Sequence, residues 1–280
     1  MTRLSIITPS LNQGRFLEEA LESVRAQQYG NVEHLVFDGG SSDETLGVLR
    51  GCDGQPEWAH MRWRSGPDAG QSDALNRGFD EAQGEIVAWL NADDRYTDGC
   101  FAHVESAFAE DPSLDVLYGD LADVDEQGRL VRVRREIEFS RFILLYHHVL
   151  YIPTPAAFFR RRVFTDGNRL RTDLHFAMDY EFFLRLAAKG YRIRHTRSVL
   201  AEFRTHPQSK SCQMRVAQAE EKREILRSLS PVAKRLRSPK LRDSTLFALS
   251  VAAAGMRRLR KAVRGDYFLP ETTLAGKGEV

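Results

Sequence analysis

The chain has 280 residues, of which 42% are hydrophobic and 28% are charged, a composition that excludes a disordered chain or a collagen-like fibre. Its three cysteines are odd in number and form no CxxC pair, so a disulfide framework and a zinc site are not indicated and a reducing compartment is favoured. No stretch reaches the roughly 18 consecutive apolar residues of a membrane-spanning helix. We therefore expect a cytoplasmic protein.

The net charge of +1 conceals an uneven distribution along the chain. Residues 1–210 hold 25 Lys and Arg against 32 Asp and Glu, whereas residues 211–280 hold 15 against 7. The C-terminal segment is therefore a basic appendage on an acidic body. Such an appendage is usually a solvated face, but it also suits anionic lipid or nucleic acid. Peripheral contact with the inner face of a membrane is one of the interpretations that stay open, and we expect no nucleic-acid partner.

Short apolar runs alternate with helical patterns in the first half of the chain. The runs are too short for helices and predict buried strands at residues 4–8, 33–38, 85–90 and 116–118. Amphipathic or capped segments between them predict helices at residues 14–28, at about 41–51 and at 70–83. This alternation predicts a parallel sheet with helices on its faces, which is an α/β fold.

The second half is less regular, which predicts a mixed arrangement of strands and helices. An aromatic-rich run at 139–151 and a Pro-punctuated segment after it interrupt the alternation. The predicted elements are an extended stretch at 130–135, a helix at 179–189, edge strands at 191–195 and 198–203, and basic helices at 213–228 and 244–263.

Polar side chains follow the predicted strands where the strands end. In a doubly wound sheet these ends converge with helix N-termini, and ligands bind there. Adjacent Asp93 and Asp94 follow a buried apolar strand, where two like charges raise each other's pKa unless a cation lies beside them. A hard divalent metal would compensate the pair, and a helix N-cap is the alternative interpretation.

Four motifs occur in order along the chain: TPSLN at 8–12, FDGGSSDET at 37–45, SGPDAGQSDALNRG at 65–78 and WLNADD at 89–94. Together they resemble the family 2 glycosyltransferases, which are inverting enzymes of the GT-A fold, over about residues 3–205. The resemblance implies a Rossmann-like fold with a mixed central sheet, a nucleotide-diphospho-sugar donor, and Mn²⁺ or Mg²⁺ at an Asp-x-Asp-type position.

The resemblance also assigns residues to the donor and the metal. Asp38 matches the acid that reads the base and favours a UDP-sugar, although Gly39 stands where many members have a second Asp. The metal position falls on Asp93 or Asp94, which the resemblance does not separate, with His206 as a third ligand. The donor residues implied are Thr8, Pro9, Ser10, Asn12, Asp38, Gly39, Asp68, Asp73, Asn76, Asn91, Ala92, Asp93 and Arg204.

A segment downstream, Ala177-Met178-Asp179-Tyr180-Glu181-Phe182, resembles the place where these enzymes carry their catalytic base. An acid in the first turn of a helix gains from the helix dipole and stays ionised near neutral pH, as a base must. We therefore predict Asp179 as the base, with Glu181 as the second candidate. An ordinary N-cap is the structural alternative.

The predicted organisation is a GT-A glycosyltransferase domain at 1–211 and a basic helical extension at 212–280. Within the domain, residues 1–120 form the nucleotide-sugar half and residues 121–211 the acceptor and catalytic half. The extension carries an apolar stretch at 244–256 bracketed by Arg and Lys, which is too short to span a bilayer. It could lie in the membrane interface, or pack on the domain or on a second subunit, so an oligomer stays open.

These observations favour an enzyme that transfers a sugar with inversion to a hydroxyl of a glycan or lipid-linked acceptor, in cell-surface or extracellular polysaccharide biosynthesis. One alternative is a non-catalytic assembly subunit that binds nucleotide sugars, which the loss of the metal-site acids would indicate. Another is a nucleotidyltransferase of similar topology, which needs a Gly-rich loop with Lys and Arg after the first strand. A dinucleotide-dependent oxidoreductase is disfavoured because no GxGxxG motif occurs.

Overall fold

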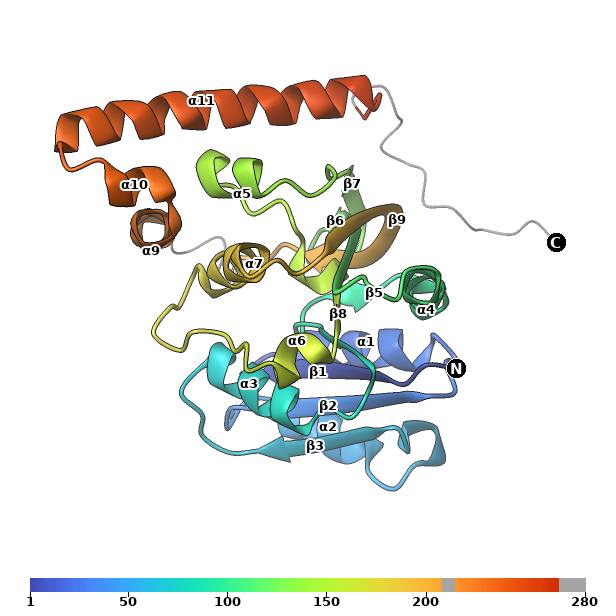
Figure 1. Cartoon of the computed structure of the whole chain (residues 1–280). Coiled ribbons are helices and arrows are strands. Elements are labelled where there is room, and N and C mark those ends of the chain that lie inside the picture. Colours follow the sequence, from blue (N-terminus) through green and yellow to red (C-terminus); the bar gives the residue numbers. More distant parts are fainter. Residues whose placement is uncertain (208–214, 267–280) are drawn as a thin grey trace.

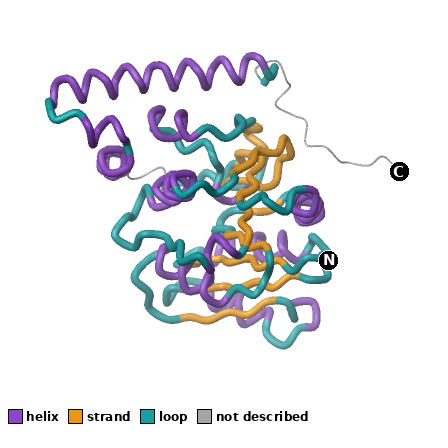
Figure 2. Tube along the Cα trace, viewed as in Figure 1, coloured by secondary structure: helices purple, strands orange, loops and turns teal. Residues whose placement is uncertain are grey.

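The computed structural model describes residues 1–207 and 215–266. In this part of the chain one mixed sheet has the strand order β3-β2-β1-β4-β8-β6-β9-β5, with β7 paired to β6. Helices lie against both faces of the sheet, and the C-terminal helices stack beyond α5 and α7 (Figures 1 and 2). The mixed α/β fold predicted from the sequence is confirmed.

The first half forms the parallel part of the sheet. Its elements are β1 (Leu4–Ser10), α1 (Gly14–Arg25), β2 (Val32–Asp38), α2 (Thr45–Cys52), β3 (Met61–Ser65), α3 (Gln71–Glu81) and β4 (Ile86–Trp89), with a 3₁₀ turn at Pro56–Trp58. All the predicted elements of this half are present. Strand β3 was not predicted, because Arg62 and Arg64 interrupt its apolar pattern and an edge strand needs no continuous apolar run.

Antiparallel pairs enter the sheet in the second half, because β8 pairs in that sense with both β4 and β6. The elements are β5 (Arg95–Tyr96), α4 (Cys100–Glu110), β6 (Val116–Val124), β7 (Leu130–Arg134), α5 (Arg141–His147), β8 (Ala157–Arg160), α6 (Arg162–Thr165), α7 (Met178–Ala188) and β9 (Ile193–Arg204), with a 3₁₀ turn at Thr154–Ala156. Helices α4, α5 and α6 and strands β5 and β8 were not predicted.

The prediction of two edge strands at 191–195 and 198–203 is wrong. A single strand, β9, begins at Ile193, runs through both segments and lies inside the sheet between β6 and β5. Its register with β6 shifts around Asp120. At that point a Cβ on Gly119 would lie 2.6 Å from the Ser198 carbonyl oxygen, so the strands approach closely only because Gly119 has no side chain. In the sequence, the polar residues near this shift resemble a turn, and for this reason two strands were predicted in place of one.

Three C-terminal helices pack on the rest of the protein: α9 (Arg215–Leu229), α10 (Pro231–Arg235) and α11 (Pro239–Val263). Helix α11 lies along α5 at the outer side of the molecule (Figure 1). Ile225, Leu226 and Ala253 are buried in the same apolar cluster as α5 and α7. The two predicted basic helices, 213–228 and 244–263, correspond to α9 and α11. Residues 213–214 of the first prediction lie outside the described residues.

The basic groups of α11 partly turn inward. Arg257 pairs with the buried carboxylate of Glu136 at 2.8 Å, and Arg260 donates to the backbone carbonyl of Glu138. Packing on the domain, one of the three arrangements left open by the sequence, is therefore what the structure shows for the inner face of α11. In the described ranges, no helix combines the length and the apolar character needed to cross a membrane.

Substitutions in the C-terminal helices test whether they belong to the core. Leu226 is 6% exposed and Leu259 is 63% exposed, so the two positions carry the same residue type but differ in burial. We expect Leu226→Ala to lower the free energy of unfolding by about 2–5 kcal/mol, because it removes buried methylenes and leaves a cavity. Leu259→Ala should change it by less than about 0.5 kcal/mol. Urea denaturation of both variants measures this, and equal small effects would contradict the packing.

Candidate active site

The predicted site residues of the first half come together at one edge of the sheet. Strands β1, β2 and β3 are in register at their carboxyl ends, where Ser10 lies beside Asp38 and Asp38 beside Ser65. Strand β4, next to β1, ends at Trp89, directly before the loop that carries Asn91. The loops that follow these strands therefore meet at a single ligand-binding edge, as expected for a doubly wound sheet.

Asp38 lies at the base of this edge and is buried. Its Oδ2 accepts the backbone N–H groups of Gly40 (3.2 Å) and Ser41 (3.1 Å), and the hydroxyl of Ser65. A pocket of about 120 Å³ opens beside it. The lining residues are Phe37, Asp38, Arg64, Ser65, Gly66, Pro67, Asp68, Ala74 and Arg77.

The space beside Gly39 is filled by another carboxylate. A Cβ on Gly39 would lie 2.9 Å from Asp68 Oδ2, while Asp68 Oδ1 accepts the N–H of Gly70 at 2.8 Å. Asp68 thus places its charge where a side chain at position 39 would project. Asp38 and Asp68 line the same pocket. Two carboxylates are therefore present where the nucleotide base is predicted to bind, although position 39 is a glycine.

The other predicted donor residues of this half divide into free and engaged groups. Ser10 Oγ is buried and has no hydrogen-bond partner among the described residues, so it can bind a ligand. Pro9 and Ala92 are buried and support the loops. The remaining four side chains already have partners within the protein. These contacts are Thr8 Oγ1 with His34 Nε2 (2.8 Å), Asn12 Oδ1 with the Ser42 N–H (2.9 Å), Asp73 with Arg77 (2.7 Å), and Asn76 with the backbone N–H and carbonyl of Leu170 (2.9 Å each).

Asp93 and Asp94 differ in their surroundings. Asp94 is 1% exposed, accepting from Asn91 Nδ2 (2.9 Å) and from the backbone N–H of Arg204 (3.2 Å). Asp93 is half-buried, and its Oδ2 lies 3.1 Å from Nε2 of His206. Burial and the neighbouring Asp93 raise the pKa of Asp94 well above its ordinary value. Two acids this close, one of them beside an imidazole, form an O and N donor set that suits Mn²⁺ or Mg²⁺.

This donor set is incomplete by itself. Within residues 1–207 and 215–266, no group of three or more His, Cys, Asp or Glu side chains has the arrangement of a metal site. A metal held there needs ligands from a bound molecule, which is the usual situation for Mg²⁺ with substrate phosphates. Asp93 is the more accessible of the two acids, whereas its neighbour His206 is only 3% exposed and Asp94 joins the loop to the end of β9.

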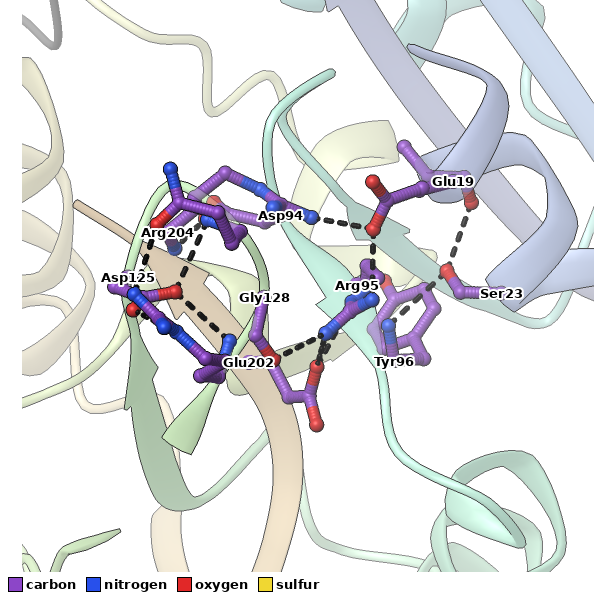
Figure 3. Close-up of polar contacts among 12 residues, drawn as sticks. Glu19, Ser23, Asp94, Arg95, Tyr96, Asp125, Gly128, Glu202 and Arg204 are labelled. Atoms are coloured by element: carbon purple, nitrogen blue, oxygen red, sulfur yellow. Dashed lines mark hydrogen bonds and ion pairs between the residues drawn. The ribbon is translucent and has the colours of Figure 1, made fainter. Parts of the chain in front are cut away.

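Arg204 forms a network that fixes the end of β9 (Figure 3). Its guanidinium, 1% exposed, donates to the Asp93 carbonyl (3.1 Å), the Glu126 carbonyl (2.8 Å) and Glu19 Oε2 (2.6 Å). Glu19 also pairs with Arg95 of β5 (2.7 Å). The predicted contact between Arg204 and a donor would require this buried guanidinium to exchange a partner.

Side-chain contacts connect the acidic loop to the start of α7. Asn91 Oδ1 accepts from Gln71 Nε2 at 2.9 Å, at the first residue of α3. The next residue, Ser72, hydrogen-bonds the sulfur of Met178, the first residue of α7. The predicted metal loop and the predicted base are therefore linked through the N-terminus of α3, although about 85 residues of sequence separate them.

Asp179 is half-buried in the first turn of α7, and its Oδ1 accepts the N–H of Tyr180 (2.7 Å). Burial raises the pKa of Asp179 above its ordinary value, and the charge of Lys222 opposes this rise. Glu181 is committed elsewhere, because it forms an ion pair with Arg185 at 2.8 Å. Of the two candidate bases, Asp179 is the one that forms no ion pair in the described part of the chain.

A carboxylate from α9 anchors the loop before Asp179. Glu221 accepts the backbone N–H groups of His175 (2.9 Å), Phe176 (2.9 Å) and Ala177 (2.8 Å). Sequence reasoning missed Glu221, Lys222, Gln71 and Arg64. Gln71 lies within a recognised motif, but the other residues carry no local signal because tertiary packing alone brings them to the site.

The sequence model of a known family, described as Glycosyl transferase family 2, matches residues 5–167. A glycosyltransferase of Mycobacterium tuberculosis is 36% identical over 206 residues, which cover 72% of this chain and 75% of that protein. A PGL/p-HBAD biosynthesis glycosyltransferase of Mycobacterium bovis is 36% identical over 118 residues, 42% of this chain and 46% of its own length.

Two solved structures share the fold. S. aureus TarS residues 1–349, in complex with UDP-GlcNAc, superposes with a TM-score of 0.67 at 17% identity, covering 97% of this chain and 76% of that chain. The mannosyltransferase PcManGT of Pyrobaculum calidifontis, in complex with GDP-Man and Mn²⁺, gives a TM-score of 0.61 at 17% identity, with 100% and 76% covered.

Proposed function

The chain belongs to glycosyltransferase family 2, and from this premise we propose that it transfers a sugar from a nucleotide-diphospho-sugar to an acceptor hydroxyl with inversion at the anomeric carbon. One observation carries the proposal. The Asp93–His206 pair and Asp179 lie at the two ends of one set of contacts through Asn91, Gln71 and the start of α7. Single displacement needs a leaving-group site and a base held in fixed relation to each other.

The residues at the metal-site end and at the Asp179 end of this set of contacts would have different roles. Asp93 and His206 would hold a divalent metal, which when bound neutralises charge on the leaving diphosphate. Asp38, Asp68 and the Ser10 hydroxyl, which has no hydrogen-bond partner among the described residues, would bind the nucleoside. Asp179 would accept the proton of the acceptor hydroxyl as its oxygen attacks the anomeric carbon from the side opposite the diphosphate.

A UDP-sugar is the favoured donor, because a carboxylate such as Asp38 can accept the N3–H of uracil. TarS with UDP-GlcNAc and PcManGT with GDP-Man show that the fold accommodates either base. A screen of nucleotide sugars by thermal shift, with Mn²⁺ and with EDTA, tests the proposal. We expect one nucleotide family to raise the melting temperature in Mn²⁺ alone, since a ligand that binds only the native state stabilises it. No stabilisation by any nucleotide sugar would contradict the proposal.

The raised pKa of Asp179 predicts the pH dependence of transfer. A base must be deprotonated, so kcat/KM should fall as the pH drops through a pKa above the ordinary Asp value. Lys222 lowers this pKa and Glu221 raises it. Lys222→Met should therefore move the acid limb of the profile to higher pH, and Glu221→Gln should move it to lower pH. Shifts in the same direction, measured as kcat/KM from pH 4 to 8, would contradict the assignment.

We further propose that the acceptor is a glycan or a lipid-linked intermediate used for cell-surface polysaccharide, and that α11 brings the enzyme to the inner face of a membrane. Besides the charged Asp243 and Arg258, the exposed side of α11 carries several large apolar side chains, and exposed cations lie in α10, in the link to α11 and at the start of α11. The exposed large apolar side chains are Leu241, Phe247, Val251, Met256, Leu259 and Val263, and the exposed cations are Lys234, Arg235, Arg237 and Lys240. This combination suits an anionic lipid surface.

Vesicle co-sedimentation tests the membrane contact. We expect the chain to bind phosphatidylglycerol-containing vesicles, and the double change Phe247→Ser and Leu259→Ser to lower the bound fraction by about tenfold or more. Val131→Ser removes an equally exposed apolar side chain on β7 and should leave binding unchanged. Absent binding by the unmodified chain contradicts the contact. A dimer that the double variant dissociates would assign the apolar side of α11 to a second copy.

A further inference from the structure

A second pocket lies beside α9, on the side of the protein that carries Asp179. Its volume is about 300 Å³, and it is lined by His148, Gln218, Ala219, Lys222 and Arg223. We call it the basic pocket, because three of these five side chains are Lys, Arg or His and no acid is among the described lining residues. The nucleotide-binding residues described above do not include any of the five.

Lys222 and Arg223, the two cations of the basic pocket, form no ion pair in the part of the chain that the structure describes. Lys222 places its ammonium 5.7 Å from the centre of the Tyr180 ring, and it makes no hydrogen bond or ion pair with any described residue. Arg223 is exposed and is likewise unpaired within the described ranges. Burial lowers the pKa of His148, and the charges of Lys222 and Arg223 lower it further. The side chains therefore concentrate positive charge, and the carboxylate whose charge acts on Lys222 is that of Asp179.

The basic pocket is attached to the loop that positions the predicted base. Gln218 donates to the carbonyl of Phe176 (3.0 Å), and Glu221 accepts three N–H groups of the same loop. Lys222 is near enough to Asp179 for each charge to alter the pKa of the other. An acceptor that presents a hydroxyl to Asp179 thus brings its neighbouring groups to Lys222 and Arg223.

We infer that the basic pocket binds a phosphate group of the acceptor, next to the hydroxyl that receives the sugar. This inference rests on the proposed function, because it takes Asp179 as the base. The donor diphosphate has its own site at Asp93 and His206, which leaves the cations of the basic pocket for the acceptor. Charge-assisted hydrogen bonds from Lys222 and Arg223 suit phosphate oxygens. An acceptor that carries phosphate on a lipid or on a sugar presents the same group.

Phosphate binding is measured in a background that cannot bind the donor diphosphate. The full chain carrying Asp93→Ala, in EDTA, is titrated with glucose 6-phosphate as a soluble probe and with micelles containing dodecyl phosphate as a lipid probe. We expect the background variant to bind at least one probe, and preference between them identifies the source of the phosphate. Adding Lys222→Ala or Arg223→Ala should weaken binding by about tenfold or more, the effect of losing one charge-assisted bond.

Arg227→Ala is the matched control, because Arg227 is an exposed cation one turn further along α9 and does not line the basic pocket. It should leave the affinity unchanged. The inference is overturned if neither probe binds, or if Arg227→Ala weakens binding as much as the pocket variants. Arg223 is exposed and makes no ion pair with a described residue, so Arg223→Ala stays informative even where Lys222→Ala alters folding.

Steady-state kinetics of sugar transfer separate the binding of the acceptor from the chemical step. Arg223→Ala should raise the KM for a phosphorylated acceptor by about tenfold and leave the KM for the donor unchanged. The proposed function fails on its own if no nucleotide sugar binds while the phosphate probes still do. Normal donor binding with an unchanged acceptor KM overturns the inference alone.

Discussion

Asp179→Asn should lower kcat for sugar transfer by on the order of 10² or more while the affinity for donor and metal stays nearly the same. The change keeps the shape of the side chain and the hydrogen bond to the Tyr180 N–H, but it removes the group that accepts the proton. Positioned proton transfer typically contributes about 10²–10⁴-fold in rate, and an interaction confined to the transition state is lost from kcat rather than from binding.

Asp173→Asn is the matched control, since Asp173 precedes α7 in the same segment and is exposed in an ion pair with Arg171. It should retain transfer. Single-turnover kinetics together with calorimetric donor binding distinguish the outcomes. Unchanged turnover in the Asp179→Asn variant would contradict its role as the base, and an equal loss of donor binding would make Asp179 a structural cap.

Asp93→Ala should weaken metal-dependent binding of nucleoside diphosphate by on the order of 10²-fold, because it removes an oxygen ligand and the partner of His206. His206→Ala should weaken the same binding in the same direction. Calorimetry with Mn²⁺ and with EDTA measures the effect, and the difference between the two conditions should be largest for the unmodified chain.

Asp98→Ala provides the control for the metal site, because Asp98 is an exposed acid five residues after Asp93. Its affinity should equal that of the unmodified chain in both conditions. Equal affinity of the unmodified chain with and without metal would remove the metal from the mechanism. A full effect of Asp98→Ala would indicate long-range electrostatics rather than coordination.

The sequence predicts much of this edge of the sheet because the information is local. Asp38 ends β2, Asp68 lies in the loop after β3, and Asp93 and Asp94 lie in the loop after β4, and the topology of a parallel sheet brings these strand ends together. It does not separate Asp93 from Asp94. Only the structure shows that Asp94 bonds to the end of β9 whereas Asp93 pairs with His206.

Residues that act through tertiary packing were not predicted. Glu221 resembles any acid on a basic, solvated helix, and its three bonds to the loop before α7 exist only because α9 packs there. Arg204 was predicted from a motif, yet its partner Glu19 lies 185 residues earlier in α1. A motif specifies the residue type at a position, whereas the partner of a buried charge depends on the whole fold.

The C-terminal extension is a further case in which the sequence predicts helices but not how they pack. Its composition predicts basic helices with an apolar stretch but does not predict which side faces the domain. In the structure Arg257 turns inward to Glu136 while Phe247 and Leu259 face outward. The division of the chain at about residue 211 stays a prediction, since Glu221 and Lys222 lie beyond it and act on the loop and the base before it.

The anomeric configuration of the product is the most direct test of single displacement by Asp179. Proton NMR during the first minutes of reaction, with the α-linked donor identified in the thermal screen, reports the configuration before the sugar equilibrates. Attack from the side opposite the diphosphate predicts a β-configured product, with water as the acceptor or with the natural one. An α-configured product would show retention and would contradict the proposed mechanism.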